Sequence, residues 1–176
     1  MPIKYLAFDT ETTCFHQREA FEPFRLLELG WACYAENGTL LSSHNYIIKV
    51  NVPISDEASE YHGITKQRAE EEGKPLAEVM TLFMSDVDQA DTLIAHNMEF
   101  DMKVVMKELN RDDYFEILKS KKKVDTMRDR KFLKSNGKWY KLNDLYRECF
   151  GHPFSNAHNS LADAQASAEI YFYKQH

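Results

Sequence analysis

The sequence predicts an α/β fold, a mixed sheet flanked by helices, and three observations support this prediction. Three short apolar runs near the N-terminus read as strands, at residues 3–8, 26–34 and 39–50. The dipeptide Asn37-Gly38 is a strong hairpin signal, so we expect these strands to form an antiparallel meander. The rest of the chain alternates between helical apolar spacing and short apolar runs, as in helices that alternate with parallel strands.

Capping residues and apolar spacing predict the remaining elements. Ser55 is expected to cap a short helix that breaks near Gly63, and Thr65 to begin another. Further helices are predicted over residues 75–87, 97–109, 126–133, 142–149 and 161–173, with short strands at 92–95 and 123–124. The first strand is expected to end at Asp9. With no repeat or linker in sight, we expect residues 1–176 to form a single domain.

Composition limits the class of protein. Of the 176 residues, 43% are hydrophobic and 28% charged, which suits a globular domain with one good core. No apolar run approaches the roughly 20 residues that span a membrane, so no membrane association is expected. The first residues are too short an apolar stretch for a signal peptide. Cys14, Cys33 and Cys149 show no metal-ligand spacing, so we interpret them as reduced thiols of a cytoplasmic protein.

The net charge of −6 is unusual for a dedicated nucleic-acid-binding protein. Its distribution is uneven, because residues 119–141 contain ten Lys or Arg and only two Asp. This basic segment could follow a phosphate backbone, or it could be an ordinary solvated helix face and loop.

Asp9 and Glu11 follow the first apolar run. Two residues apart on a strand, their side chains share one face. Two adjacent carboxylates repel each other unless a cation lies between them, so the pair is suited to half of a metal site. A solvated strand edge is the alternative interpretation.

Two further acids each stand five residues after a histidine, as His96…Asp101 and His158…Asp163. Both aspartates fall near a predicted helix start, where a carboxylate is favoured in any case. A neutral His158 on a loop could take a proton from water at physiological pH. For His96 we favour a structural role, while the adjacent Asn97 could cap the helix or reach substrate.

Together these motifs indicate a nuclease. Four carboxylates close together need positive charge, and a pair of divalent metal ions, Mg²⁺ or Mn²⁺, would supply it. Two-metal sites of this kind cut phosphodiester bonds.

At these residues the chain resembles a known family. Asp-Thr-Glu-Thr at 9–12, His-Asn-x-x-Phe-Asp at 96–101 and His-x-x-x-x-Asp at 158–163 occur in the order of the three motifs of the DEDDh 3′→5′ exonucleases. That superfamily includes the proofreading epsilon subunit of DNA polymerase III, RNase T and oligoribonuclease. Residues 26–30, 62–65 and 141–145 are similar to it as well, so the resemblance covers nearly the whole chain.

The resemblance implies an RNase H-like fold and a role for each motif residue. Asp9, Glu11 and Asp163 would bind one metal ion, Asp9 and Asp101 a second, and His158 would be the general base. The product would be a nucleoside 5′-monophosphate released from the 3′ end of single-stranded DNA or RNA. Substrate contacts would come from the chain near Thr10 and Thr12, from His62 and from Asn97. Relatives of this kind form homodimers or bind a polymerase, and the motifs do not choose between these partners.

The chain departs from the family pattern after the first motif. Cys14 stands where a glycine is usual, and the stretch that follows is longer than a minimal member needs. This chain could therefore bind the 3′ end of its substrate differently from other members of the family. Two other functions stay open at this stage. One is a non-catalytic nucleic-acid-binding module, and the other is a phosphodiesterase for a small nucleotide.

Overall fold

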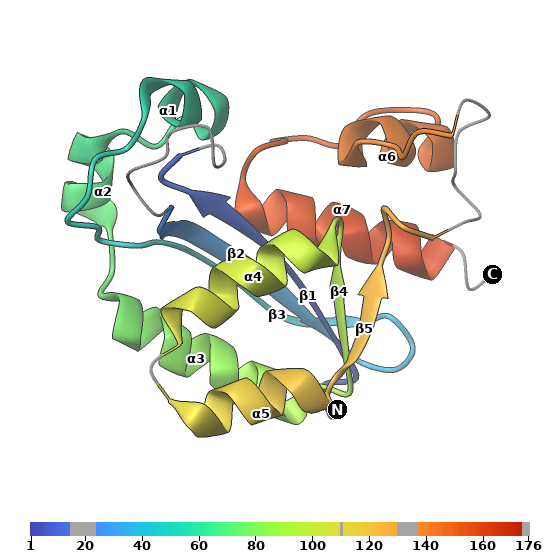
Figure 1. Cartoon of the computed structure of the whole chain (residues 1–176). Coiled ribbons are helices and arrows are strands. Elements are labelled where there is room, and N and C mark those ends of the chain that lie inside the picture. Colours follow the sequence, from blue (N-terminus) through green and yellow to red (C-terminus); the bar gives the residue numbers. More distant parts are fainter. Residues whose placement is uncertain (15–23, 110, 130–136, 174–176) are drawn as a thin grey trace.

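The computed structural model describes residues 1–14, 24–109, 111–129 and 137–173, and these build a mixed sheet between helices (Figure 1). The strands are β1 (Tyr5–Thr12), β2 (Leu26–Tyr34), β3 (Leu40–Ile47), β4 (Thr92–Ala95) and β5 (Lys122–Asp125). Their order across the sheet is β3-β2-β1-β4-β5. The pairs β1–β2 and β2–β3 are antiparallel, whereas β4 runs parallel to β1 and β5 parallel to β4. The predicted meander and the α/β class are therefore confirmed.

The helices lie on both faces of this sheet. They are α1 (Asp56–His62), α2 (Lys66–Glu72), α3 (Leu76–Gln89), α4 (Met98–Glu108), α5 (Asp112–Ser120), α6 (Leu142–Phe150) and α7 (Ser160–Tyr173). Helices α3, α4 and α5 cover one face, and α7 covers the other (Figure 1). The first face carries the larger core, in which Phe8 and Trp31 pack with Phe83. On the second face small residues such as Ala164 and Ala168 let α7 lie close to the strands.

The predicted caps and turn are present. The Ser55 hydroxyl accepts a hydrogen bond from the Ala58 N–H at 3.2 Å, and the Thr65 hydroxyl caps α2 in the same way. Gly63 ends α1 with φ at 73°, and Gly38 in the β2–β3 turn has φ at 79°. Glycine adopts this left-handed backbone without the steric penalty that a Cβ atom brings.

The structure differs from the predicted elements at three places. Strand β1 continues past Asp9 to Thr12, because Glu11 still pairs with Glu28 across the sheet. Helix α5 was not predicted at all. No helix forms over 126–129, where the Asp125 carboxylate accepts the N–H groups of Met127 and Arg128 in a turn. Residues 130–133, the rest of that predicted helix, lie outside the described residues.

Within the described part of the chain, every helix is too short or too polar to cross a bilayer.

Candidate active site

Three acidic side chains from β1 and α7 meet in one cluster. Asp9 and Glu11 share a face of β1, and Asp163 lies in the first turn of α7. One carboxylate oxygen from each lies within 4.8 Å of the other two. Glu11 is buried, while the other two are partly buried. The spacing of two on β1 therefore produces the shared face that the sequence predicted.

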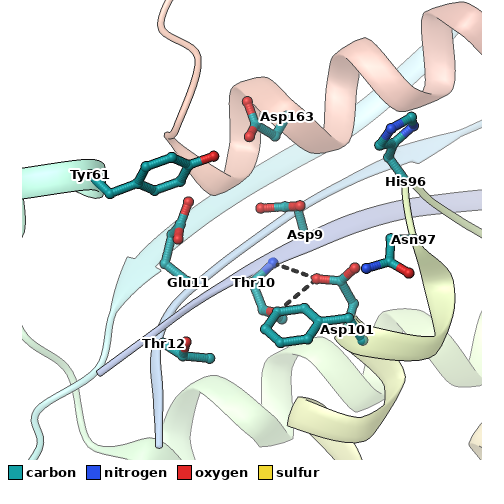
Figure 2. Close-up of a pocket in the computed structure, with 10 residues that line it drawn as sticks. Asp9, Thr10, Glu11, Thr12, Tyr61, His96, Asn97, Asp101 and Asp163 are labelled. Carbon is teal, nitrogen blue, oxygen red and sulfur yellow. Dashed lines mark hydrogen bonds between the residues drawn. The ribbon is translucent and has the colours of Figure 1, made fainter. Parts of the chain in front are cut away.

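The cluster lies on one side of a pocket, which Figure 2 shows. The lining residues come from β1, α1, the turn before α4, and both α4 and α7. They are Asp9, Thr10, Glu11, Thr12, Tyr61, His96, Asn97, Phe100, Asp101 and Asp163. All four predicted acids thus line one pocket, although they are spread over more than 150 residues of sequence.

Asp101 lies on the α4 side of this pocket, apart from the three-acid cluster. It is 2% exposed, and its Oδ1 accepts hydrogen bonds from the N–H and the hydroxyl of Thr10, at 3.0 and 2.7 Å. These bonds orient the carboxylate and tie α4 to β1. Thr10, which was predicted to contact substrate, is buried and bonded to Asp101.

Burial raises the pKa of all four acids, and the charges of neighbouring acids add to this effect at Asp9 and Glu11. Burial, together with the charge of Asp163, raises the pKa of Glu11 to about 8. Burial likewise raises the pKa of Asp101 and of Asp163 to about 7, and burial with the charge of Asp101 raises that of Asp9 well above its usual range. Within the described residues, none of the ion pairs of Lys or Arg involves the three-acid cluster. The charge that would keep these acids ionised at neutral pH must come from elsewhere.

A divalent cation fits this donor set. Mg²⁺ and Mn²⁺ prefer carboxylate oxygens, and three of these converge here without a competing ammonium or guanidinium group among the described residues. Asp9, Glu11 and Asp163 could therefore hold a metal ion, with Asp101 across the pocket.

His158 stands outside the lining of this pocket. Its side chain is exposed, and its ring packs on the ring of Tyr61 with centroids 4.0 Å apart. Its backbone N–H donates to Asp163 Oδ1 at 3.2 Å. The φ angle of 71° is in the left-handed region, which is strained for a residue with a Cβ atom. Burial, with the charge of Lys141, lowers the pKa of the imidazole and so favours its neutral form.

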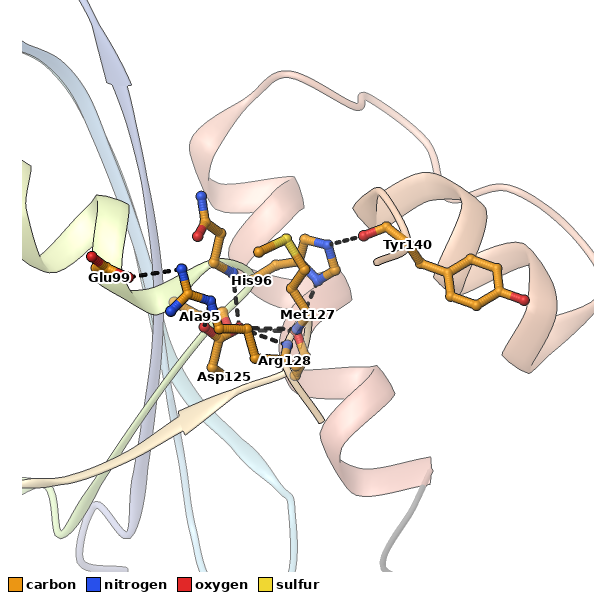
Figure 3. Close-up of polar contacts among 9 residues, drawn as sticks. Ala95, His96, Glu99, Asp125, Met127, Arg128 and Tyr140 are labelled. Carbon is orange, nitrogen blue, oxygen red and sulfur yellow. Dashed lines mark hydrogen bonds and ion pairs between the residues drawn. The ribbon is translucent and has the colours of Figure 1, made fainter. Parts of the chain in front are cut away.

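His96 has a different environment, drawn in Figure 3. Its Nδ1 lies 3.0 Å from the Thr126 hydroxyl and its Nε2 lies 3.0 Å from the Tyr140 carbonyl oxygen. Both ring nitrogens are thus engaged with the protein, which agrees with the structural role favoured from the sequence. The carbonyl can only accept, so Nε2 carries the proton and Nδ1 accepts from the hydroxyl.

Asn97 lines the pocket from the turn before α4. Its φ angle is 73°, and its backbone N–H donates to Asp125 Oδ1 at 3.0 Å. Arg128 pairs with that same carboxylate and, at 2.7 Å, with Glu99 (Figure 3). These contacts hold the strained turn and, with it, the start of the helix that carries Asp101.

His62 and Thr12 are joined to each other. The Ile64 N–H donates to His62 Nδ1 at 3.1 Å, so Nε2 carries the proton and donates to the Thr12 carbonyl at 3.3 Å. Thr12 reaches the pocket, whereas His62 is not among the described residues that line it. His62 anchors α1 to the end of β1, and through α1 it places Tyr61.

A family model described as exonuclease, RNase T, matches residues 6–171, nearly the whole chain. The chain belongs to this exonuclease family. The match confirms the resemblance to the 3′→5′ exonuclease superfamily that the three motifs carry. No curated protein shows a significant match to the sequence.

Solved structures with the same fold are exonucleases as well. Exonuclease I of E. coli in complex with a dT13 oligonucleotide has 18% sequence identity and a TM-score of 0.73, over 95% of this chain and 40% of that one. Exonuclease I of Methylocaldum szegediense has 18% identity and a TM-score of 0.69, over 97% and 40%. A product-bound exonuclease I has 18% identity and a TM-score of 0.77, over 99% and 44%. The fold is therefore RNase H-like, and the chain spans about two fifths of these proteins.

Tyr61 and Phe100 are pocket residues whose place the sequence did not reveal. Figure 2 shows the Tyr61 side chain directed toward Glu11 and Asp163, and burial with the charge of Glu11 raises the pKa of its phenol. Phe100 lines the pocket while also packing on core residues. Tyr61 is the next-to-last residue of a helix of only seven residues, too short for apolar spacing to show which way a side chain faces.

The basic segment is only partly described, since Arg130, Lys131 and Lys134 lie outside the described residues. Much of the described charge is engaged locally. The ammonium groups of Lys121 and Lys123 donate to backbone carbonyls at the C-terminal end of α3 and of α5. For the residues around Lys121 and Lys123, these contacts favour the interpretation of an ordinary helix face and loop over that of a phosphate-binding segment.

Proposed function

We propose that this chain is a single exonuclease domain that removes nucleotides from the 3′ end of single-stranded DNA or RNA with the help of divalent metal ions. The observation that carries the proposal is the cluster of Asp9, Glu11 and Asp163, with oxygens within 4.8 Å in a pocket. Crowded carboxylates with raised pKa values are unfavourable in a fold unless they serve a cation. Membership of the exonuclease family supports the same reaction.

Two metal ions, Mg²⁺ or Mn²⁺, fit the four acids. Asp9, Glu11 and Asp163 would hold the first, and Asp9 with Asp101 the second. The ions supply positive charge to the attacking and leaving oxygens of the phosphodiester. The Thr10 hydrogen bonds keep Asp101 pointed at the pocket, so that the protein need not reorganise when a metal binds.

His158 is proposed as the general base. A neutral imidazole can accept a proton from the water that attacks the terminal phosphorus, and the lowered pKa keeps His158 neutral at physiological pH. Its backbone is already bonded to Asp163, but its ring packs on Tyr61. We propose that the imidazole leaves Tyr61 and turns into the pocket when substrate is bound, and that the strained φ angle marks this mobile turn.

The residues that line the pocket are suited to binding a single strand. Tyr61 and Phe100 offer aromatic surfaces on which an unpaired terminal base could stack, and Thr12 and Asn97 offer polar contacts for the sugar and phosphate. Three of the related exonuclease I structures were solved with dT13 or dA16 oligonucleotides. The choice between DNA and RNA depends on contacts to the 2′-hydroxyl. With Cys14, Cys33 and Cys149 as free thiols, we further propose a cytoplasmic location.

The test uses a single-stranded oligonucleotide labelled at its 5′ end, in DNA and RNA versions. In Mn²⁺ or Mg²⁺ we expect a ladder that shortens one nucleotide at a time, and release of 5′-monophosphates. EDTA and Asp163→Ala should each abolish it. An oligonucleotide that stays intact but is bound would favour a binding module instead, and hydrolysis of small nucleotides alone would favour a phosphodiesterase.

A further inference from the structure

Glu28 on β2 is a buried carboxylate that lies beside the acidic cluster without lining its pocket. It is 2% exposed and stands directly opposite Glu11 in the β1–β2 register. Its negative charge adds to the repulsion on Glu11, Asp9 and Asp163. A buried acid in such surroundings is costly, so its contacts have to explain its presence.

Both oxygens of Glu28 are engaged by elements that surround the site. Oε2 accepts the backbone N–H of Ser160, the first residue of α7, at 2.9 Å. Oε1 accepts the side-chain amide of Asn45 on β3 at 2.9 Å. The carboxylate thus connects the start of α7 to the sheet, three residues before Asp163.

Gly30 makes this connection possible. It lies opposite Asp9 in the same register, on the same face of β2 as Glu28. A Cβ atom at Gly30 would sit 2.1 Å from the backbone nitrogen of Leu161, so only glycine allows α7 to lie this close. In the β1–β2 register, Glu28 is therefore paired with Glu11 and Gly30 with Asp9. The first turn of α7 packs on Glu28 and Gly30.

We infer that Glu28 is a positioning residue that docks the first turn of α7 on β2 and so brings the Asp163 carboxylate to Asp9 and Glu11. The inference rests on the proposed function, because the geometry it maintains is that of the metal site. In this role Glu28 contacts no substrate and binds no metal. It acts through its hydrogen bond to the Ser160 N–H, and its length matters more than its charge.

Three substitutions separate length from charge. Glu28→Ala removes the docking bond, and Glu28→Asp keeps the charge but is one methylene too short to reach both partners. Glu28→Gln keeps the length and can still accept from Ser160. Its new amide can donate to Asn45 Oδ1, an atom without a partner among the described residues, once the Asn45 side chain flips.

We expect Glu28→Ala and Glu28→Asp to lower kcat and to weaken Mn²⁺ binding, measured by calorimetry, each by about 10- to 100-fold. KM for the oligonucleotide should change much less, because the pocket wall is intact. Glu28→Gln should stay within roughly threefold of the parent in both measurements, as expected for one replaced hydrogen bond. Equal losses in Glu28→Gln and Glu28→Ala would show that the charge acts rather than the docking bond, and an unimpaired Glu28→Ala would overturn the inference outright.

Glu108→Ala is the matched control for a general loss of stability. Glu108 is a similarly buried carboxylate that accepts a backbone N–H of β2, from Leu26 at 3.1 Å, but it lies at the far end of α4. We expect Glu108→Ala to lower the melting temperature without changing Mn²⁺ affinity. A loss of Mn²⁺ affinity as large as that of Glu28→Ala would assign the effect to stability alone.

Hydrogen exchange of the metal-free protein separates this inference from the proposed function. The Ser160 amide should exchange faster in Glu28→Ala and Glu28→Asp than in the parent, and at the parent rate in Glu28→Gln. Unchanged exchange in all three variants would refute the docking bond. A parent protein that binds no Mn²⁺ and cuts no oligonucleotide would instead refute the proposed function, whatever the exchange rates show.

Discussion

Residues 96–101 and 158–163 share one pattern, a histidine five residues before an aspartate, yet the fold places them in opposite environments. Both aspartates lie in the first turn of a helix, and a residue with positive φ, Asn97 or His158, stands just before each helix. In the first region both ring nitrogens of the histidine are bonded to the protein. In the second the imidazole is exposed and packs only its face on Tyr61.

The difference shows how one spacing can serve two purposes. His96 joins the turn before α4 to residues 126 and 140, so it holds Asp101 in place but has no nitrogen available for chemistry. Among the described residues, His158 is hydrogen-bonded to the site through its backbone N–H, while its ring packs on that of Tyr61, which leaves the ring able to move. We therefore propose a structural histidine with a fixed acid on one side of the pocket, and a mobile histidine with a cluster acid on the other.

The largest expected effect comes from removing the acids of the two regions. Asp163→Asn and Asp101→Asn should each lower kcat by about 10⁴-fold, because metal ions supply much of an acceleration that is typically 10⁶-fold or more. Only Asp163→Asn should also abolish the stabilisation by Mn²⁺, since Asp163 belongs to the three-acid cluster. Gel assays and thermal melts measure both effects.

Asp113→Asn is the control for these two variants, because Asp113 is exposed on α5 and pairs with Arg111. It should behave like the parent. Retention of activity in Asp163→Asn would contradict the proposed site.

Replacing His158 should mainly lower activity, whereas replacing His96 should mainly lower stability. His158→Gln should lower kcat by about 10²- to 10⁴-fold, the usual contribution of a general base, with little change in melting temperature. His96→Ala should instead lower the free energy of unfolding by about 1–3 kcal/mol, because it leaves partly buried polar groups unpaired. Urea unfolding and single-turnover kinetics distinguish the two. The reverse pattern would mean that the roles are exchanged.

Metal ions should stabilise the protein. At a hundred times its Kd, Mg²⁺ or Mn²⁺ should add about 2.7 kcal/mol to the free energy of unfolding, provided that it does not bind the unfolded chain. For a protein of this size the melting temperature should rise by roughly 5–10 °C. A Na⁺ titration at matched ionic strength controls for screening. A melting temperature that does not change in millimolar Mn²⁺ would contradict an assembled metal site.

The last expected effect is the pH dependence of the metal-free protein. The folded pKa of Glu11 is raised to about 8, and that of Asp163 to about 7, above their ordinary values of 4.5 and 3.8. The folded state therefore binds more protons than the unfolded state across this window, and its stability must fall as the pH rises from about 4 to about 8. Melting scans in EDTA measure the decline. Saturating Mg²⁺ should reduce it, and a stability that rises over this window would be inconsistent with the crowded acids.

Much of the fold could be predicted from local signals. The Asn37-Gly38 turn, the Ser55 and Thr65 caps and the apolar spacing of α3 act over a few residues, so they can be recognised without the partner elements. The missed elements give short or misleading local signals. Helix α5 spans only nine residues, with Leu118 buried and Tyr114 and Ile117 half-buried against the core, so its apolar stripe is short. Residues 126–129 form a turn in which the Asp125 side chain accepts backbone N–H groups, although apolar spacing had predicted a helix there.

The sequence by itself determined the fold class, the family and the four acids that line the pocket, because strand alternation and motif order are properties of the chain. Only the tertiary structure decided that Tyr61 packs on the ring of His158, that both ring nitrogens of His96 are hydrogen-bonded and that Glu28 connects β2 to α7. The physical reason is that these roles are set by pairs up to 132 residues apart. Whether a side chain is buried, bonded or available depends on what the other elements bring to it, and no local pattern contains that information.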